Sequence, residues 1–287
     1  MNLAYHDIRH NLGRFILTCA GLSLLLGVVL SMIGIYRGLV ADALTLARTP
    51  AADIWAVESG TRGPFAESSR IPGDAREAIA RLQGVADAGS VTYQSIETIY
   101  GSGKIRLYVV GYEPNRLGGP DQIVEGRAIA RSHYEIIADR RAKLKVGERV
   151  KIGDNYFSVV GLTNSQVSSG GDPVVYMSLL DSQELQFELA SPAARREAAR
   201  GNIPNKTDMD TINAVVARLK PQVSADEVVN AIERWKHFSA MTQQEQENIL
   251  TRSVVDKARK QIGLFTAILL IVSAVKCADA RCESHFR

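Results

Sequence analysis

The longest uninterrupted apolar pattern in the sequence runs from Phe15 to Tyr36, twenty-two residues without a charged side chain. An α-helix rises about 1.5 Å per residue, so this segment would be about 33 Å long and could cross the hydrocarbon core of a bilayer. Arg9 and Arg14 precede it, and Arg37 follows it. The pattern predicts a transmembrane helix over residues 15–36.

The residues before this helix also show a helical pattern. Within residues 1–14, Leu3, Ala4, Ile8 and Leu12 recur at roughly helical spacing, with charged residues elsewhere around the turn. This predicts a short segment lying at the membrane interface. The arginines close to the span favour a cytoplasmic N-terminus by the positive-inside rule.

A cleaved signal peptide is the competing interpretation of the same region. Ala41, Asp42 and Ala43 form a small-x-small triplet that a peptidase could cut. A secretory signal, however, has an apolar region of about 7–15 residues, and this one is longer. A retained helix is therefore favoured, and the chain downstream is expected on the far side of the membrane.

Small residues recur within the predicted membrane helix. Gly27 and Gly34 are seven positions apart, two turns along one face, and Ser31 lies between them. Small side chains let two membrane helices approach closely, so Gly27, Ser31 and Gly34 are the predicted helix-packing residues of a dimer. The alternative is that glycine is simply frequent in membrane helices.

Downstream of Tyr36 the apolar positions follow two different periods. The helical pattern continues outward until Pro50, as a stalk beyond the bilayer would require. Strands are predicted over residues 53–58, 91–100, 105–110, 149–152, 156–160, 174–177 and 212–219, with apolar and polar residues alternating in 105–110. A helical period predicts helices over residues 74–82, after Ser178 as far as Phe187, after Ser224 (a capping box) as far as Trp235, and over 243–260.

These elements predict one external domain over residues 37–261. Strands and helices are mixed without a strict βαβ alternation, so the predicted fold class is α+β. A Gly- and Pro-rich stretch at residues 111–120 lies between the two predicted hairpins, which predicts two lobes. Residues 190–209 carry little apolar content and are predicted to be an exposed segment.

Composition narrows the possible functions of that domain. The chain is 46% hydrophobic and 23% charged, which is ordinary for a globular protein, and its net charge of +3 is too small to indicate nucleic-acid binding. Its three cysteines are Cys19, Cys277 and Cys282, so no disulfide is expected in the external domain.

The sequence offers no cluster of catalytic or metal-ligating residues. The five histidines are scattered, and His133 is interpreted as a surface residue. No phosphate-binding loop occurs, and Gly101-Ser102-Gly103 is interpreted as a hairpin turn because a strand follows it. The basic run at residues 139–143 is interpreted as a solvated helix face. The chain is therefore predicted not to be an enzyme and to hold no cofactor or metal.

One long stretch nevertheless has a familiar order of elements. Val124-Glu125-Gly126-Arg127 is followed by Tyr134-Glu135-Ile136-Ile137, then by Ala142-Lys143-Leu144-Lys145-Val146-Gly147-Glu148-Arg149-Val150 and the hairpin at residues 156–162. This order resembles the MacB/FtsX/LolE-type permease subunits of ABC transporters, and the resemblance extends to about Val275.

The resemblance implies a permease subunit without catalytic activity of its own. In that family a partner ATPase binds ATP at the cytoplasmic side of a permease dimer, and the membrane helices pass the motion to the external domain. It implies a bacterial inner (plasma) membrane location with the main domain extracytoplasmic, a lipid bilayer environment, and a possible extracytoplasmic partner protein. The expected role is export or mechanotransmission.

Two functions from other classes compete with this interpretation. A two-helix transmembrane sensor would place an extracytoplasmic ligand-binding domain between its helices, but no cytoplasmic signalling module follows Val275. A membrane-anchored hydrolase is disfavoured because no catalytic cluster is present. A neighbouring gene for a Walker-type ATPase would discriminate the permease from both.

The end of the chain departs from the family pattern. Residues 262–275 are apolar but would extend only about 21 Å, short of the roughly 30 Å hydrocarbon core. Residues 276–287 form a charged, cysteine-containing tail. The sequence therefore predicts a membrane-anchored domain between one complete and one incomplete transmembrane helix, as in a truncated permease. The alternative is a two-helix protein whose second helix recruits Val254 or Val255. That helix would bury the charged residues at 256, 257, 259 and 260, at about 2.5–3.5 kcal/mol for each charge near the bilayer centre.

Overall fold

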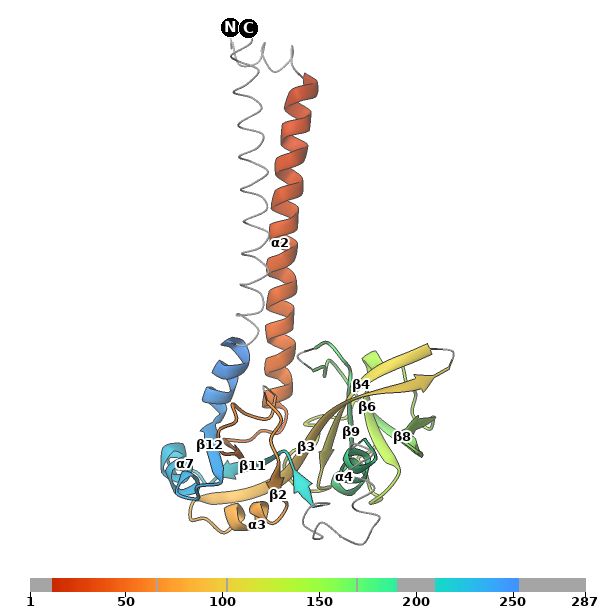
Figure 1. The fold of residues 1–287 in the computed structure, drawn as a ribbon. Coiled ribbons are helices and arrows are strands. Elements are labelled where there is room, and N and C mark those ends of the chain that lie inside the picture. Colours follow the sequence, from red (N-terminus) through yellow and green to blue (C-terminus); the bar gives the residue numbers. More distant parts are fainter. Residues whose placement is uncertain (1–11, 66, 102, 169, 190–209, 253–287) are drawn as a thin grey trace.

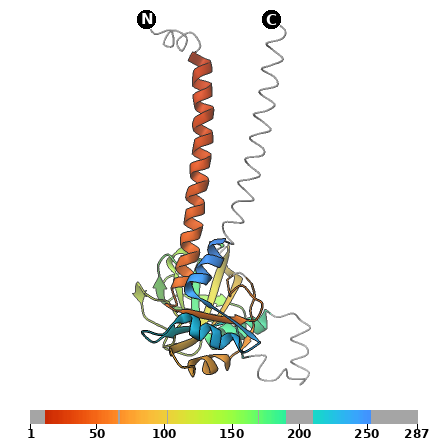
Figure 2. The same cartoon turned by 90° about the vertical axis from the view of Figure 1, so that its left-hand side faces the viewer.

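The computed structural model describes residues 12–65, 67–101, 103–168, 170–189 and 210–252. A long helix, α2 (Leu12–Arg48), rises from a sheet-dominated domain (Figures 1 and 2). By length and composition its part from Cys19 to Arg48 could cross a membrane. The predicted segments at residues 1–11, 190–209, 262–275 and 276–287 lie outside the described residues.

Ten strands form one mixed sheet in the order β12-β1-β11-β3-β4-β9-β6-β8-β5, with β7 paired to β8. Most neighbours are antiparallel, whereas β4 pairs with β9, and β6 with β8, in parallel. The strands are β1 (Ile54–Glu58), β3 (Val85–Tyr100), β4 (Gly103–Tyr112), β5 (Glu125–Gly126), β6 (Glu135–Asp139), β7 (Arg149–Ile152), β8 (Asn155–Thr163), β9 (Val174–Ser178), β11 (Ala214–Leu219) and β12 (Phe238–Thr242). A separate two-stranded sheet joins β2 (Ile71–Pro72) to β10 (Thr211–Ile212).

Short helices connect and cover these strands. They are α3 (Ala75–Ala80), α4 (Leu179–Glu188), α7 (Ala225–Glu233) and the 3₁₀ helix η1 (Arg140–Ala142), and residues 243–252 are helical. The predicted cap of α4 is confirmed, because the Ser178 hydroxyl accepts from the Asp181 N–H. Ser224 occupies the N-cap position of α7, but its side chain makes no capping hydrogen bond, so this half of the predicted capping box is wrong.

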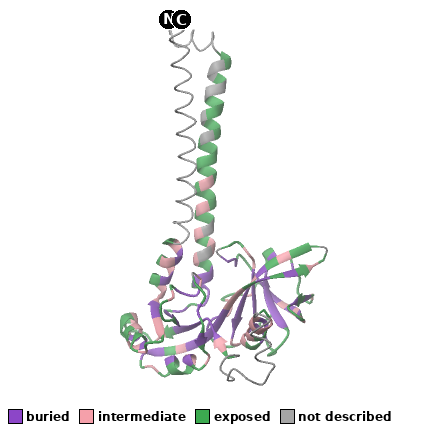
Figure 3. Ribbon diagram, viewed as in Figure 1, coloured by how far each residue is buried: buried purple, intermediate pink, exposed green. Residues whose placement is uncertain are grey.

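Alternation along the strands divides the core among three clusters. On β1, Trp55 and Val57 point to a cluster that also holds Leu46 of α2, while Ile54 and Ala56 point to the opposite cluster beneath α3 and α7. A third cluster packs between α4 and the strands β6 to β9. Both faces of the central strands are buried, whereas most of the described residues of α2 are exposed (Figure 3).

The continuous sheet contradicts the predicted division into two lobes at residues 111–120. Strand β9 pairs with β4 on one side and with β6 on the other, so hydrogen bonds run without a break from the first hairpin to the second. Strand β9 lies between β4 and β6 although it follows β4 by about sixty residues in the chain. The local Gly- and Pro-rich pattern cannot reveal a pairing between such distant segments. Most of the other predicted strands and helices are confirmed, although β3 is longer than expected. Strands β2, β5, β6 and β12 lie outside the predicted strands.

Candidate functional site at the base of helix α2

Helix α2 ends inside the domain rather than on its surface. Leu46 is 4% exposed and belongs to the cluster that lies under β1, β4, β9 and β11, and Ala47 is fully buried. Pro50 follows Thr49, and Ala51 adopts a positive φ of 49°, so the chain turns sharply into β1. The last turn of the helix is therefore part of the domain's core.

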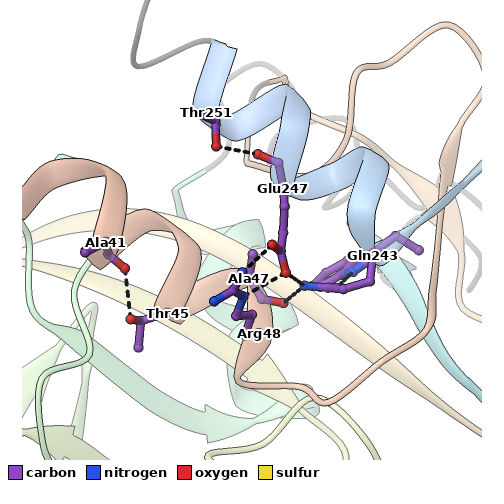
Figure 4. Close-up of polar contacts among 8 residues, drawn as sticks. Ala41, Thr45, Ala47, Arg48, Gln243, Glu247 and Thr251 are labelled. Atoms are coloured by element: carbon purple, nitrogen blue, oxygen red, sulfur yellow. Dashed lines mark hydrogen bonds and ion pairs between the residues drawn. The ribbon is translucent and has the colours of Figure 1, made fainter. Parts of the chain in front are cut away.

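An ion pair joins this last turn to the helix at residues 243–252. The Arg48 guanidinium donates from Nε to Glu247 Oε1 at 2.8 Å and from Nη2 to Oε2 at 2.5 Å (Figure 4). Such a two-point contact fixes orientation as well as distance. Donation from Arg48 lowers the pKa of Glu247, and donation from Gln243 adds to the effect. Glu247 is therefore held as a carboxylate at neutral pH.

Gln243 connects three elements at the same place. Its side-chain carbonyl accepts from the indole N–H of Trp55 at 2.7 Å, and its amide group donates to the Ala47 carbonyl at 3.2 Å and to Glu247 Oε1 at 3.1 Å. The Ala47 carbonyl belongs to the last turn of α2, where carbonyls lack a partner within the helix. Gln243, the first residue of the helix at 243–252, thus joins the end of α2 to β1 and to Glu247 of its own helix.

A second set of contacts joins α2 to the other end of the sheet. Gln166, in the connection between β8 and β9, donates from Nε2 to the Thr49 hydroxyl at 3.4 Å. Its backbone N–H donates to the fully buried Asp139 at 2.7 Å, and its side-chain carbonyl accepts from the Tyr176 hydroxyl. Nearer the membrane helix, Arg141 Nη1 lies 3.4 Å from Asp42 Oδ2.

These contacts define the base of α2, which comprises residues 42–49 of the helix and turn together with Trp55, Gln166, Gln243 and Glu247. Its polar groups are paired with one another, and its apolar groups lie in the core. A tilt or shift of α2 would have to break these bonds or carry the domain with it. The arrangement can therefore transmit a mechanical displacement.

The sequence analysis does not identify the residues of this site as a group, because each of them belongs to a different local pattern. Arg48 was one of the charges beyond the span, Arg141 belonged to a run interpreted as a solvated helix face, and Gln243 merely opened a polar helix. Their partners lie up to 199 positions away in the chain. No local signal identifies such pairs.

The predicted packing residues lie elsewhere on α2. Gly27, Ser31 and Gly34 are all exposed, and a side chain added at either glycine would meet nothing within 4 Å. Among the described residues nothing covers this face of the helix, and dimer formation through it stays a prediction. His133 is half exposed and contacts the buried Asp181, with 2.8 Å between Nδ1 and Oδ1. Within the described residues, no group of three or more histidine, cysteine, aspartate and glutamate side chains could hold a metal ion.

Comparison of the sequence with known protein families gives one match that covers most of the chain. The MacB-like periplasmic core domain matches residues 15–235. Two proteins described as uncharacterized ABC transporter permeases, from two strains of Mycobacterium tuberculosis, are each 25% identical over 185 residues. That alignment covers 64% of this chain and 52% of each relative, so the chain spans about half the length of these relatives.

Two solved structures were also similar. The periplasmic region of MacB from Actinobacillus actinomycetemcomitans aligns over 68% of this chain and 91% of its own, with a TM-score of 0.44 and 11% identity. The extracellular domain of the ABC-type transporter YknZ, from Gram-positive bacteria, aligns over 66% and 98%, with a TM-score of 0.41 and 11% identity. The family match over residues 15–235 covers most of the sequence, and the chain belongs to the MacB-like periplasmic core domain family.

Proposed function

We propose that the chain is part of the membrane-spanning permease subunit of an ABC transporter, in which α2 passes movement from the bilayer to the sheet domain. The observation that carries this proposal is the base of α2, where Arg48 and Ala47 are bonded to Glu247 and Gln243. Membership of the MacB-like family supports it. The domain is placed on the extracytoplasmic side of a bacterial inner membrane.

The geometry of α2 suits such a role. Its charge-free segment ends at Tyr36, and the helix continues unbroken to Arg48, about 18 Å farther. A continuous helix carries a displacement that a flexible linker would absorb. Since the helix ends in the core of the domain, any tilt of its outer part acts directly on the sheet.

The energy for this movement would come from a partner. The chain is proposed to have no catalytic activity and no cofactor of its own, while a partner ABC-type ATPase binds ATP. Two copies of the permease would associate in the bilayer, with Gly27, Ser31 and Gly34 at the helix contact. Replacing Gly27 and Gly34 by Leu is expected to reduce crosslinking between copies in membranes, and unchanged crosslinking would contradict this contact.

The test uses a full-length version of the permease in nanodiscs together with a candidate ABC-type ATPase. The native cysteines are replaced, and a spin label at position 151 on β7, where Lys151 is exposed, reports the distance between two copies. We expect the ATPase to co-purify and ATP to change that distance. Failure of both would overturn the proposed function.

A matched pair of variants locates the route of transmission. Glu247→Ala removes the partner of Arg48, whereas Glu227→Gln changes an exposed carboxylate on α7, away from the base. The first is expected to reduce the ATP-dependent change in distance, and the second to leave it intact. An equal response in both variants would mean that the base of α2 does not transmit the movement.

A further inference from the structure

Gln246, on the helix at residues 243–252, is fully buried and makes no hydrogen bond with any described residue. Its exposure is 0%, and its side-chain nitrogen and oxygen are both unpaired. The Tyr93 hydroxyl is likewise buried without a partner among the described residues. A buried polar group without a partner destabilises the state that buries it, because its hydrogen bonds with water are not replaced.

Both of these residues contact one short segment between β1 and β2, residues 62–65, which we call the strap. A Cβ at Gly63, where φ is 96°, would overlap the side-chain oxygen of Gln246, so the strap backbone lies directly against the unpaired amide. Two residues farther along, the Phe65 ring packs against the Tyr93 ring with 4.9 Å between centroids. The strap therefore lies against both residues whose polar groups are unpaired.

Packing, rather than hydrogen bonding, holds the strap against the domain. The Arg62 N–H donates to Glu67 Oε2 at 3.2 Å, and the Gly63 carbonyl accepts from the Glu67 N–H at 3.2 Å, so these bonds are local. Among the described residues, no hydrogen bond joins the strap to the sheet or to the helix at residues 243–252. Moving the strap away would therefore break no such bond, and it would let water reach Gln246.

We propose that the strap is poised to open away from the sheet, and that the helix at residues 243–252 controls its opening. In the closed state the Phe65 ring packs between Trp55 and Tyr93, at 5.4 and 4.9 Å, while the Gln246 amide stays unpaired. In the open state water pairs the amide, but Phe65 loses its packing. Because these two effects oppose each other, a displacement of the helix that carries Gln246 shifts the balance between the states.

The same helix connects the strap to the base of α2. Glu247, the residue after Gln246, is paired with Arg48 at the end of α2. Any movement of α2 that displaces Glu247 would also displace the unpaired amide against the strap. This trigger rests on the proposed function, whereas the opening of the strap does not.

Native-state proteolysis of the whole chain in nanodiscs measures the opening. Trypsin cuts after arginine, and the Arg62–Gly63 bond is shielded while Gly63 is buried. When opening and closing are fast relative to cleavage, the cleavage rate follows the population of the open state. Cleavage at the exposed Arg131–Ser132 bond of the same sample is the internal reference.

The same substitution at three glutamines of one helix tests the proposal. Gln246→Met keeps most of the side-chain volume and removes the unpaired amide, so cleavage at the strap should slow about fivefold to a hundredfold. Gln243→Met removes the bonds to Trp55 and Ala47, which should loosen the helix and speed that cleavage. The control is Gln244→Met at an exposed position, which should leave the rate unchanged.

Phe65→Ala tests the opposing effect. It removes the ring that packs between Trp55 and Tyr93, so it should speed cleavage at Arg62. The rate at the Arg131 reference bond should stay that of the parent chain in every variant. Global unfolding would instead speed cleavage at both bonds, so the reference separates strap opening from a loss of the whole fold.

Three results would overturn the inference. If trypsin does not cut the folded parent chain at Arg62, the strap does not open. If Gln246→Met leaves the rate unchanged or raises it, the amide has a partner in solution, such as a bound water molecule. If Gln243→Met behaves like Gln244→Met, the helix does not control the strap. No ATPase is present in these measurements, so their failure is distinguishable from failure of the proposed permease function.

Discussion

The two ends of the sheet hold helix α2 in different ways. At the β12-β1-β11 end, the bidentate pair of Arg48 with Glu247 and the amide of Gln243 contact the last turn of the helix. At the β9-β6-β8 end, the polar contacts among the described residues include a 3.4 Å hydrogen bond from Gln166 to Thr49 and a 3.4 Å ion pair between Arg141 and Asp42. The first end is thus bonded closely to the helix and the second loosely.

This difference suggests how movement would spread through the domain. The close end must follow α2, since its contacts are short and arise from the helix terminus itself. Under the proposed function, the far end would receive the movement through Gln166, whose backbone is bonded to the buried Asp139. The hydrophobic cluster around Leu46, which also contains Ile137 and Tyr176, lies beneath both ends. Among the described residues, it is the hydrophobic cluster that both ends share with the helix.

The largest expected effect therefore comes from this shared cluster. Leu46→Ala would leave a cavity under both ends, and a buried Leu→Ala change costs about 2–5 kcal/mol of unfolding free energy. Leu46→Met keeps most of the volume and should cost less than about 1.5 kcal/mol. Urea unfolding of the whole chain in detergent, followed by the fluorescence of Trp55 and Trp235, measures both. A loss below about 1 kcal/mol for Leu46→Ala would show that α2 is not anchored by this cluster.

Strand β1 and helix α4 are examples of elements that the sequence predicts. The apolar run from Ile54 to Val57 predicts a strand, and Ser178 predicts the start of a helix, because both signals are local. Strand β12 has no comparable signal, and its partner β1 is almost two hundred positions away. The base of α2 was likewise missed, since Arg48 and Glu247 meet only in the folded chain.

The start of β3 shows a different reason for failure. Residues 85–90 include Asp87 and Gly89, which strands disfavour, yet pairing with β11 extends the strand over them. Gly89 is needed there, because a Cβ at this position would lie 2.0 Å from the Leu117 carbonyl oxygen. Tertiary packing thus decides the conformation against local propensity.

The second prediction concerns an ion pair within the loosely held end. Glu135 is 5% exposed and accepts from Arg127 Nη2 at 2.6 Å and from the N–H groups of Ala130 and Arg131 at 2.9 and 3.1 Å. Glu135→Gln weakens these charge-assisted bonds and should cost about 1–3 kcal/mol. If the far end depends on this carboxylate, the variant will lose unfolding free energy, whereas Arg149→Gln, at an exposed position on β7, will not.

The same carboxylate predicts a dependence on acid. Hydrogen bonds from Arg127 lower the pKa of Glu135 from 4.5 to about 2, with the two backbone N–H groups contributing. A carboxylate with a lowered pKa in the folded state stabilises it above the ordinary pKa, and the stability is lost as the pH falls from about 4.5 toward 2. Unfolding free energies measured over that range should fall less steeply in Glu135→Gln. Parallel profiles for the two proteins would contradict this role.

The third and smaller effect is at the closely held end. The side chain of Arg48 is 61% exposed, so solvent screens its bond to Glu247, and Glu247→Gln should cost only about 0.5–1 kcal/mol. Because the pKa of Glu247 is lowered, this contribution is present at neutral pH and decreases as the solution is acidified below the ordinary glutamate pKa. High salt should reduce the difference between variant and parent. A difference that salt leaves unchanged would mean that packing, rather than charge, joins the two helices.

The smallest expected effect on stability is that of substituting Arg141. This substitution also tests most directly whether the two ends of the sheet hold α2 differently. The contact of Arg141 with Asp42 is long and largely exposed, so Arg141→Ala should leave the unfolding free energy unchanged. Spin labels at exposed positions 41 on α2 and 151 on β7 should nevertheless report a broader distance distribution, because one of two links to the far end is lost. The control is Arg140→Ala, since Arg140 pairs with Glu125 and not with α2.

The outcome of this pair decides how the far end is coupled to the helix. If Arg141→Ala and Arg140→Ala give the same distribution, the ion pair contributes nothing, and Gln166 is left as the polar link. Thr49→Val, which removes the hydroxyl that Gln166 contacts, should then broaden the distribution by itself. If Thr49→Val also leaves it unchanged, the far end follows α2 through the apolar cluster around Leu46 alone, and the polar contacts there do not hold the helix.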